Sequence, residues 1–273
     1  MKLNKDTLFC ISISARPSQF GTVLHNSGYD ALGINFAYKA FATTDLKNAI
    51  AGVRALGIRG CSVSMPFKES VIEIIDDLDE TARVIGAVNT VVNASGRLTG
   101  FNTDAMAAKA ALTSIDADPN ESVLLIGSGG VARAILFAMK QMGFKKVSIT
   151  NRNMERIKSV HHILPCRTVP WLERHTFAAS LIINATSMGM SPHIHELPID
   201  ENCIQKSRAV MDVVISPAET KFIRYARSIG KKVAPGHLIV LEQALAQFAL
   251  YTGHPAPREA MALSLRELLL SIP

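Results

Sequence analysis

The sequence predicts an α/β protein of two parts: an N-terminal α/β domain, then a doubly wound domain, with C-terminal helices that return to the first. Three observations predict this class. Short apolar runs alternate with helical periodicity through most of the 273 residues, the pattern of parallel sheets with crossover helices. A glycine-rich turn opens a second such series near residue 121, and the segment 238–270 carries two long amphipathic helix patterns joined at 253–257.

The first domain is expected to comprise residues 1–103 and 238–273. One helix is expected at 17–27, ended by Gly28. Another follows Asp45, which can cap a run with apolar side chains three and four residues apart. The expected strands are 8–13, 34–38, 58–64 and the two arms of a hairpin, 88–92 and 98–101.

The second domain is expected to span residues 104–237. The polar, turn-rich stretch 116–120 indicates a surface connection before its first strand. The expected helices are 104–112 and 131–142, and the expected strands are 122–126, 146–151, 181–184, 209–214 and 232–234. This regular alternation predicts a doubly wound sheet with helices on both faces.

Composition and charge exclude several classes of protein. An apolar fraction of 48% with 19% charged residues is incompatible with global disorder. The net charge of +6 is spread without blocks and fits a small anionic ligand at least as well as nucleic acid. Because the sequence has no clustered aromatic residues and no nucleic-acid fold signature, nucleic-acid binding is not expected. No stretch approaches 18 consecutive apolar residues. We therefore expect a cytoplasmic protein, a monomer or a homodimer, that binds a small molecule and neither nucleic acid nor a membrane.

The cysteines and histidines give no sign of a metal site. The four cysteines form no C-x-x-C pair, which argues against a zinc ribbon or a redox dithiol. His193 and His195 stand beside Glu196 with no further close ligand, and a stable site needs three or four. We expect no bound metal.

A glycine motif follows the apolar strand 122–126. Gly127-Ser128-Gly129-Gly130 turns directly into a helical run that starts at Val131. Such a turn lets backbone N–H groups approach a pyrophosphate at a helix N-terminus. The motif reads G-x-G-G-x-x-R from Gly127 to Arg133 and so departs from G-x-G-x-x-G, which leaves an ordinary turn as the alternative. The context favours a Rossmann-type nucleotide-binding domain.

The end of this domain's second strand discriminates between NAD and NADP. Folds that hold NAD place an acidic side chain there for the ribose 2′-hydroxyl. This chain has Asn151 and Arg152 instead, with Arg156 one helical turn later. Because a guanidinium fits a 2′-phosphate, these residues predict NADP; an arginine that is merely solvated is the alternative.

Two polar motifs follow strand ends in the first domain. Ser64-Met65-Pro66-Phe67-Lys68 leaves one strand through a proline turn, and Asn102-Thr103-Asp104 stands at a strand-to-helix turn. Open α/β sheets bind ligands at such strand ends, so Lys68 and Asp104 could face one another there. For each residue alone, a solvated lysine and a helix-capping aspartate are the alternatives.

Taken together, these segments resemble the shikimate dehydrogenase family, including its quinate/shikimate and shikimate dehydrogenase-like branches, nearly from end to end. No single segment is diagnostic, but their order and spacing are specific. They are residues 63–68, 86–90, 102–104, 127–130, 151–152, 184–189 and Gln243. The resemblance implies reversible reduction of 3-dehydroshikimate to shikimate with NADPH.

The resemblance also implies a role for particular residues. Lys68 and Asp104 would be the catalytic pair: a lysine stabilises the negative charge that hydride transfer leaves on a ketone oxygen, and an aspartate orients that lysine and keeps it charged. The substrate-binding residues that match are Ser14, Ser64, Asn89 and Gln243. The implied cofactor-binding residues are Gly127, Ser128, Gly129, Gly130, Val131, Asn151, Arg152, Arg156, Thr186, Ser187, Met188, Val213 and Gly236.

The chain departs from the family pattern at several places. Arg16 replaces the second serine of the family's first loop, where it could be a surface residue, could occlude the pocket, or could pair with the substrate carboxylate; we favour the substrate contact. Ser64 replaces a threonine, Ile215 a tyrosine near the nicotinamide, and Leu238 a glycine. These changes predict a divergent, shikimate dehydrogenase-like member with lower turnover than housekeeping enzymes, or with a different substrate.

Two other functions stay open. The first is a catalytically weak ligand-binding or regulatory protein on the same fold, which the departures at Ile215 and Leu238 favour. The second is NAD-linked oxidation of quinate or shikimate, which Arg152 disfavours. The intact Lys68 and Asp104 favour the NADP-dependent enzyme.

Overall fold

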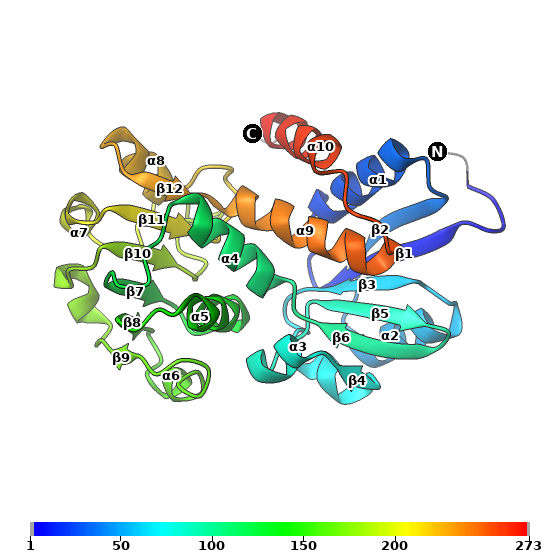
Figure 1. Ribbon diagram of the computed structural model, residues 1–273, viewed down its shortest axis with the longest axis horizontal. Helices are drawn as coiled ribbons and strands as arrows, with labels where there is room; N and C mark the ends of the chain where they lie inside the picture. The colour runs from blue at the N-terminus through cyan, green and yellow to red at the C-terminus, as the bar shows by residue number, and fades with distance from the viewer. Residues whose placement is uncertain (1–2, 272–273) are drawn as a thin grey trace. The chain divides into compact units, whose positions relative to one another are not determined.

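The chain divides into two compact units in the computed structural model, which describes residues 3–271 (Figure 1). The first unit holds the residues up to Thr103 together with Leu241–Ser271, and the second holds Asp104–Val240. Each unit contains one six-stranded sheet with helices packed on it, which confirms the predicted α/β class. The chain re-enters the first unit at Leu241, inside helix α9 (Gly236–Thr252), and not at residue 238 as expected. The sequence shows no loop at this boundary because the helix continues through it.

The sheet of the first unit is mixed, with strand order β2-β1-β3-β5-β6-β4. Strand β1 pairs in parallel with both β2 and β3, whereas β5 is antiparallel to both β3 and β6. The predicted hairpin is therefore present and supplies two of the six strands of this sheet. The strands are β1 (Leu8–Ser14), β2 (Phe36–Ala42), β3 (Gly60–Val63), β4 (Asp77–Leu78), β5 (Thr90–Ala94) and β6 (Arg97–Phe101).

The helices of the first unit correct one prediction. Helix α1 (Phe20–Leu32) runs through Gly28 and ends at Gly33, whose φ is +62°, so the expectation that Gly28 ends the helix is wrong. A Cβ on Gly28 would lie 2.7 Å from a ring carbon of Phe248; this glycine serves close packing. The unit also contains α2 (Leu46–Ala55), α3 (Glu80–Ile85), a 3₁₀ turn (Ser70–Ile74) and α10 (Arg258–Ser271).

The C-terminal helices complete the first unit. Helix α10 packs along α1, and the same Cβ on Gly28 would lie 3.2 Å from the sulfur of Met261 in α10. Phe248 of α9 and Met261 are both fully buried. The prediction that the last helices return to the first domain is therefore confirmed.

The sheet of the second unit is entirely parallel, with strand order β12-β11-β10-β7-β8-β9. Two series of strands run outward from the centre, one from β7 and one from β10, so the direction of winding reverses between these two strands. Ligands of doubly wound folds bind at this switch point. The strands are β7 (Val123–Ile126), β8 (Val147–Thr150), β9 (Arg167–Thr168), β10 (Leu181–Asn184), β11 (Ala209–Asp212) and β12 (Lys232–Ala234).

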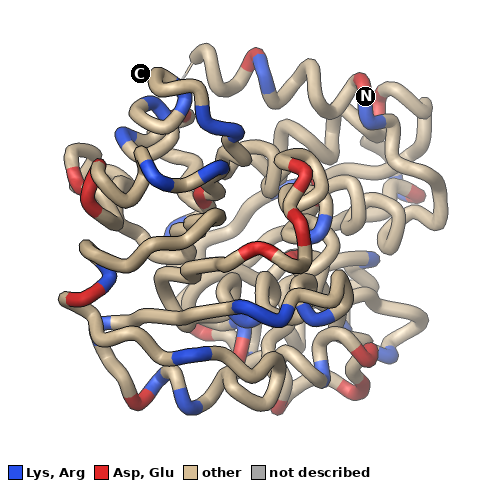
Figure 2. Tube along the Cα trace, turned by 60° about the vertical axis from the view of Figure 1, so that its left-hand side comes forward, with Lys and Arg blue, Asp and Glu red and all other residues tan. Residues whose placement is uncertain are grey.

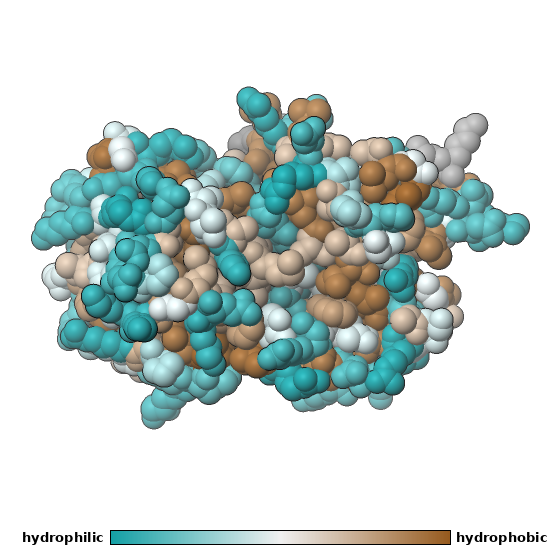
Figure 3. Space-filling model, in the orientation of Figure 1, coloured by the Kyte–Doolittle hydropathy of each residue, from teal (hydrophilic) through white to brown (hydrophobic). Residues whose placement is uncertain are grey.

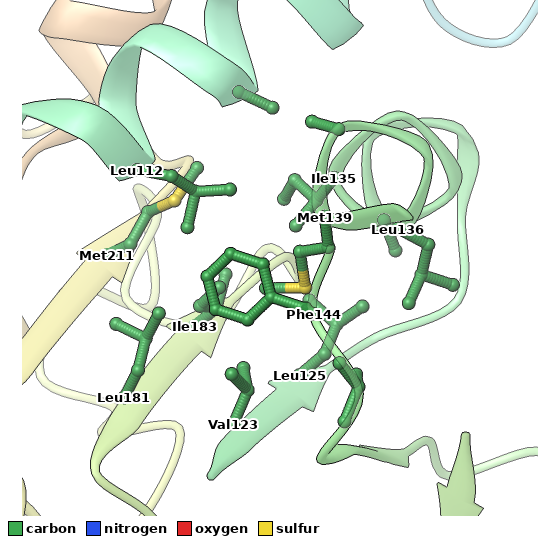
Figure 4. Packing of buried hydrophobic residues seen from close by; sticks show 14 of the residues in the cluster. Leu112, Val123, Leu125, Ile135, Leu136, Met139, Phe144, Leu181, Ile183 and Met211 are labelled. Atoms are coloured by element: carbon green, nitrogen blue, oxygen red, sulfur yellow. The ribbon is translucent and has the colours of Figure 1, made fainter. Parts of the chain in front are cut away.

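Helices cover both faces of this second sheet. Alternate residues of its central strands belong to two separate clusters of buried side chains, as expected for a sheet buried on both faces. In one cluster Leu112 and Met139 pack over Leu125 and Ile183 of the sheet (Figure 4). The helices are α4 (Asp104–Ser114), α5 (Gly130–Met142), α6 (Glu155–Lys158), α7 (Glu201–Lys206) and α8 (Lys221–Ser228), with a 3₁₀ turn at Leu172–Thr176.

The surface mixes both signs of charge. Lysine and arginine positions are interspersed with aspartate and glutamate along the trace (Figure 2), and hydrophobic residues on the viewed face lie among hydrophilic ones (Figure 3). Within residues 3–271, no helix has both the length and the apolar character needed to cross a membrane.

Candidate active site

Predicted substrate-binding residues lie together at one edge of the first sheet, the edge at which the parallel strands β1 and β3 end. Ser14 ends β1 and Ser64 follows β3; the two strands are in register through Ile13 and Val63, and the Ser64 N–H donates to the Ile13 carbonyl at 3.0 Å. Because β5 runs antiparallel to β3, its first residues lie at this same edge. Asn89 directly precedes β5, and its carbonyl accepts from the Val63 N–H at 2.8 Å.

Ser14 offers a buried hydroxyl at this edge. The side chain is buried, and its Oγ has no hydrogen-bond partner among the described residues. Buried polar groups are otherwise almost always paired, so an orphaned hydroxyl at the end of a strand fits a ligand oxygen. Arg16 and Ser64 are exposed beside it, and Gln243 is half-buried on α9.

Asn89 is held in one orientation. Its side chain is fully buried, and its Oδ1 accepts hydrogen bonds from Thr90 Oγ1 at 2.8 Å, from Thr103 N at 2.8 Å and from Thr103 Oγ1 at 3.1 Å. With Oδ1 committed to these donors, any hydrogen bond from Asn89 to a ligand must be donated by Nδ2.

The two predicted catalytic residues each follow a strand of this sheet, Lys68 after β3 and Asp104 after β6. Lys68 lies on the loop after β3, and its carbonyl accepts from the Val88 N–H at 2.7 Å, one residue before Asn89. Asp104 is the buried first residue of α4 and directly follows Thr103. Their pairing stays a prediction.

The glycine turn of the second unit stands at the switch point of its sheet. Gly127 has a φ of +113°, and a Cβ there would lie 2.7 Å from the Ala185 carbonyl oxygen, on the loop after β10. Gly129, just before α5, is exposed, and a Cβ on it would meet nothing within 4 Å. A phosphate group could therefore approach the backbone here, at the N-terminus of a 13-residue helix.

The residues after β8 fit a 2′-phosphate. Asn151 Nδ2 donates to the buried Ser128 Oγ, which ties the end of β8 to the glycine turn. Arg152 and Arg156 are both exposed, and no acidic side chain stands between residues 151 and 154. A bare 2′-hydroxyl would lack its usual carboxylate acceptor at this position, whereas two guanidinium groups suit an anion.

A buried pair joins the loops after β10 and β11. Asn184 Nδ2 donates to Asp212 Oδ1 at 3.0 Å and to the Met188 carbonyl at 3.1 Å, and Asn184 Oδ1 accepts from the N–H and the hydroxyl of Thr186. Asp212 also accepts from the Val214 N–H at 3.1 Å. The predicted cofactor-binding loop around Thr186, Ser187 and Met188 is thereby fixed to the loop that carries Val213.

Gly236 leaves no room for a side chain. A Cβ at this position would collide with the Val214 carbonyl oxygen. The start of α9 can therefore approach the loop after β11 only because residue 236 is a glycine.

Asp212 gives a testable pH dependence. Burial raises the pKa of its carboxyl to about 6, against hydrogen bonds from Thr220, Val214 and Asn184 that lower it. In the unfolded chain an aspartate titrates near pH 3.9. Between about pH 4 and 6 the folded state therefore binds more protons, and the free energy of unfolding falls as pH rises.

The Asp212→Asn variant has no carboxyl at this position and therefore loses this pH-dependent contribution to the free energy of unfolding. We expect the variant to gain stability relative to the parent by up to about 3 kcal/mol between pH 4 and pH 7, since a tenfold difference in proton affinity between the folded and unfolded states corresponds to about 1.4 kcal/mol. Urea unfolding of both proteins across this range measures the difference. A stability difference that does not change with pH would contradict the assignment to Asp212.

Four residues around the site were given no role from the sequence, although Thr90, Thr103 and Asn184 lie in the segments that carry the family resemblance. Gln247, Thr90 and Thr103 surround Asn89, and Asn184 pairs with Asp212. Gln247 follows Gln243 by four residues and so lies on the same face of α9, a spacing that could have revealed it. In the part of the chain that the structure describes, no cluster of three or more histidine, cysteine or acidic side chains could hold a metal ion.

Two family models match the chain. Residues 18–91 match the shikimate dehydrogenase substrate binding domain, and residues 108–218 match shikimate/quinate 5-dehydrogenase. The first match lies within the first unit and covers Ser64, Lys68 and Asn89. The second lies within the second unit and covers the glycine turn.

Relatives that match this chain over most of their own length agree with both family matches. A shikimate dehydrogenase-like protein of Haemophilus influenzae is 42% identical over 95% of both chains. A shikimate dehydrogenase (NADP(+)) of Moorella thermoacetica is 36% identical, over 90% of this chain and 88% of its own. A solved shikimate 5-dehydrogenase of Thermus thermophilus, in complex with NADP(H) and shikimate, superposes with a TM-score of 0.87 at 29% identity, covering 96% of this chain and 99% of its own. The chain therefore belongs to the shikimate dehydrogenase family.

Proposed function

We propose that this protein is an NADP-dependent shikimate dehydrogenase that reversibly reduces 3-dehydroshikimate to shikimate, or the corresponding ketone to a closely related cyclic hydroxy acid. The observation that carries the proposal is the polar edge of the first sheet, where an orphaned Ser14 hydroxyl and the fixed Asn89 amide lie beside the loop of Lys68. The first unit would bind the substrate and the second unit the cofactor, in a cytoplasmic monomer or homodimer.

The substrate would be held through its oxygens. Asn89 Nδ2 donates to one ring hydroxyl, and the Ser14 hydroxyl, which both donates and accepts, meets another oxygen. Ser64 and Gln243 complete the hydrogen bonds, and Arg16 pairs with the carboxylate. The exposed position of Arg16 leaves it free to reach a ligand from solvent.

Bound NADPH supplies the hydride. As the ketone carbon receives it, negative charge grows on the ketone oxygen, where the Lys68 ammonium stabilises the charge and transfers one proton to give the hydroxyl. Asp104 accepts a hydrogen bond from that ammonium and keeps it charged until the transfer. In the oxidative direction the hydroxyl proton passes to the Lys68 Nζ as the hydride leaves.

The second unit would hold the cofactor by its phosphates. The backbone N–H groups of Ser128, Gly129, Gly130 and Val131 face the pyrophosphate at the start of α5. The Gly127 N–H donates to the Thr150 carbonyl at 2.8 Å, so Gly127 contributes the close turn and no hydrogen bond to the phosphate. Arg152 and Arg156 bind the 2′-phosphate, beside Asn151. Thr186, Ser187, Met188, Val213 and Gly236 line the nicotinamide side.

The departures from the family pattern favour modest turnover. Ile215 stands where the family has a tyrosine, so one hydrogen-bonding hydroxyl is absent. Leu238 stands where the family has a glycine, so a large side chain occupies that position. A lost bond to a buried group costs about 1–3 kcal/mol. These departures favour a second candidate function, that of a weakly catalytic shikimate-binding or regulatory protein. NAD-linked oxidation of quinate or shikimate is the third candidate function.

One assay tests the proposal against both alternatives. Reduced-nicotinamide absorbance is followed with shikimate and with quinate, each in the presence of NADP and of NAD, and shikimate binding is measured by calorimetry. Oxidation of shikimate with NADP supports the proposal. Binding of shikimate without oxidation of either substrate would leave the binding protein, and faster turnover with quinate and NAD would favour the third function.

The same assay tests the role of Arg152. In Arg152→Ala the 2′-phosphate loses a charge-assisted hydrogen bond, worth about 1.5–3 kcal/mol. We expect KM for NADP to rise about 10- to 100-fold, while KM for NAD stays within about twofold. Arg167→Ala, on neighbouring β9, is the control for loss of a positive charge. Equal effects of Arg152→Ala on the two cofactors would remove Arg152 from the 2′-phosphate site.

A further inference from the structure

Gln247 lies buried at the centre of a polar network in the first unit. The side chain is 3% exposed, and most of its neighbours along the α9 sequence are apolar. We propose that Gln247 is a positioning residue for the substrate site: acting through Thr90, it sets the orientation of the Asn89 amide that meets the substrate. This inference rests on the proposed function, because it assigns Asn89 to the substrate.

The Gln247 amide connects a helix to two strands. Its Nε2 lies 3.0 Å from Thr90 Oγ1, 3.2 Å from Ser62 Oγ and 3.3 Å from the Asn89 carbonyl oxygen. Its Oε1 lies 3.4 Å from His25 Nε2, on α1. One amide group thus joins α1, α9, β3 and the start of β5, directly behind the edge where the substrate residues gather.

Each link of this network has a defined donor and acceptor. A threonine hydroxyl carries a single hydrogen, and Thr90 Oγ1 donates it to Asn89 Oδ1 at 2.8 Å. Thr90 must therefore accept from Gln247 Nε2. Asn89 Oδ1 in turn also accepts from Thr103, the residue before Asp104. Turning the Gln247 amide over would place two acceptors against each other and draw the Thr90 proton away from Asn89.

The Asn89 carbonyl oxygen, which can only accept, fixes the Gln247 amide with Nε2 toward it, and the tautomer of His25 follows from that orientation. The imidazole is fully buried and stacks on Tyr38, with ring centroids 4.4 Å apart. Burial lowers the pKa of His25 to about 4, so the ring is neutral at pH 7 and carries one N–H. Because the amide oxygen only accepts, the proton sits on Nε2 and points at Gln247 Oε1; Nδ1 has no hydrogen-bond partner among the described residues.

A purely structural role for Gln247 predicts different behaviour. If the amide only filled the core, its replacement by a side chain of similar length would lower stability and leave the substrate site unchanged. If the amide positions Asn89, its replacement frees the Thr90 hydroxyl to rotate, and the Asn89 Nδ2 donor then loses its fixed direction. Displacements of about 1 Å at a binding group can cost about 10²-fold in rate.

The test compares Gln247→Met with a matched core variant. Methionine keeps the length of the side chain and removes both hydrogen-bonding functions. Met261→Ala, fully buried in α10, removes core packing in the same unit, and the Met261 side chain makes none of the hydrogen bonds described above. Thr90→Val removes the next link while preserving shape, and serves if Gln247→Met does not fold.

Two measurements are made on each variant. The first is the NMR signals of the Asn89 side-chain amide in the ligand-free protein. The second is KM for shikimate beside KM for NADP. In Gln247→Met and in Thr90→Val we expect the Asn89 signals to shift or broaden, and KM for shikimate to rise about 10-fold or more, while KM for NADP stays within about twofold. Met261→Ala should change neither.

The outcomes separate this inference from the proposed function. Unchanged Asn89 signals and unchanged KM for shikimate in Gln247→Met, with only a stability loss like that of Met261→Ala, would overturn the positioning role. A parent protein that oxidises no shikimate would instead overturn the proposed function, and the Asn89 signals of the ligand-free variants would still decide whether Gln247 positions that side chain.

Discussion

Replacing Lys68 with alanine is expected to lower kcat for shikimate oxidation by about 10²–10⁴-fold, the usual contribution of a positioned acid or base. The variant loses the ammonium that stabilises charge on the reacting oxygen, while the oxygens that Ser14 and Asn89 bind are untouched. Dissociation constants for shikimate and NADP should therefore stay within a few fold of the parent values. Stopped-flow measurement of the hydride step and calorimetry of binding give the two quantities.

The control for Lys68→Ala is Lys47→Ala, an exposed lysine of helix α2 in the same unit. Its turnover should match that of the parent. Unchanged turnover in Lys68→Ala would remove this residue from the mechanism and turn attention to another proton donor. Lost binding with an unchanged hydride step would make Lys68 a substrate-binding residue instead.

The two glycines of the nucleotide turn should respond differently to alanine. Gly127→Ala places a Cβ 2.7 Å from the Ala185 carbonyl oxygen at a φ of +113°, which no L residue adopts without strain. We expect the free energy of unfolding to fall by about 2–4 kcal/mol, from backbone strain and the displaced strand connection together. NADP binding should weaken in parallel.

Gly129→Ala is the matched variant, since a Cβ there meets open space and the φ of −77° is ordinary. Its stability should stay within about 0.5 kcal/mol of the parent, while KM for NADP rises because the methyl group stands where the pyrophosphate approaches. Denaturant unfolding and cofactor titration measure both. Equal stability losses in the two variants would contradict the strain argument.

The sequence predicted the doubly wound unit well because its signals are local. A buried parallel strand reads as a short apolar run, and the glycine turn sits between such a strand and a helix, so β7, α5 and β8 were found within a residue or two. Asp45 likewise caps α2 through the Asn48 N–H, as its position before an amphipathic run suggested. Each of these features is decided by neighbours in the chain.

Features that depend on distant residues were not predictable in this way. Gly28 looks like a helix end, yet the ring of Phe248, far away in the chain, requires a glycine there. The short helix α3 and the 3₁₀ turn before it lie in a stretch with no clear periodicity. Gln247 reads as one polar residue among apolar ones, and only the fold shows that it reaches Thr90.

The fixed amide of Asn89 limits what the polar edge can accept. Its oxygen is occupied by hydrogen bonds from within the protein, so toward a ligand this residue is a donor alone. A hydroxyl, a carbonyl or a carboxylate can meet it, whereas an ammonium group, which has no lone pair, would bring two donors together. At the position proposed for Asn89, the site therefore favours a ring oxygen over an ammonium group of the same size, whereas the Ser14 hydroxyl, which donates and accepts, makes no such distinction.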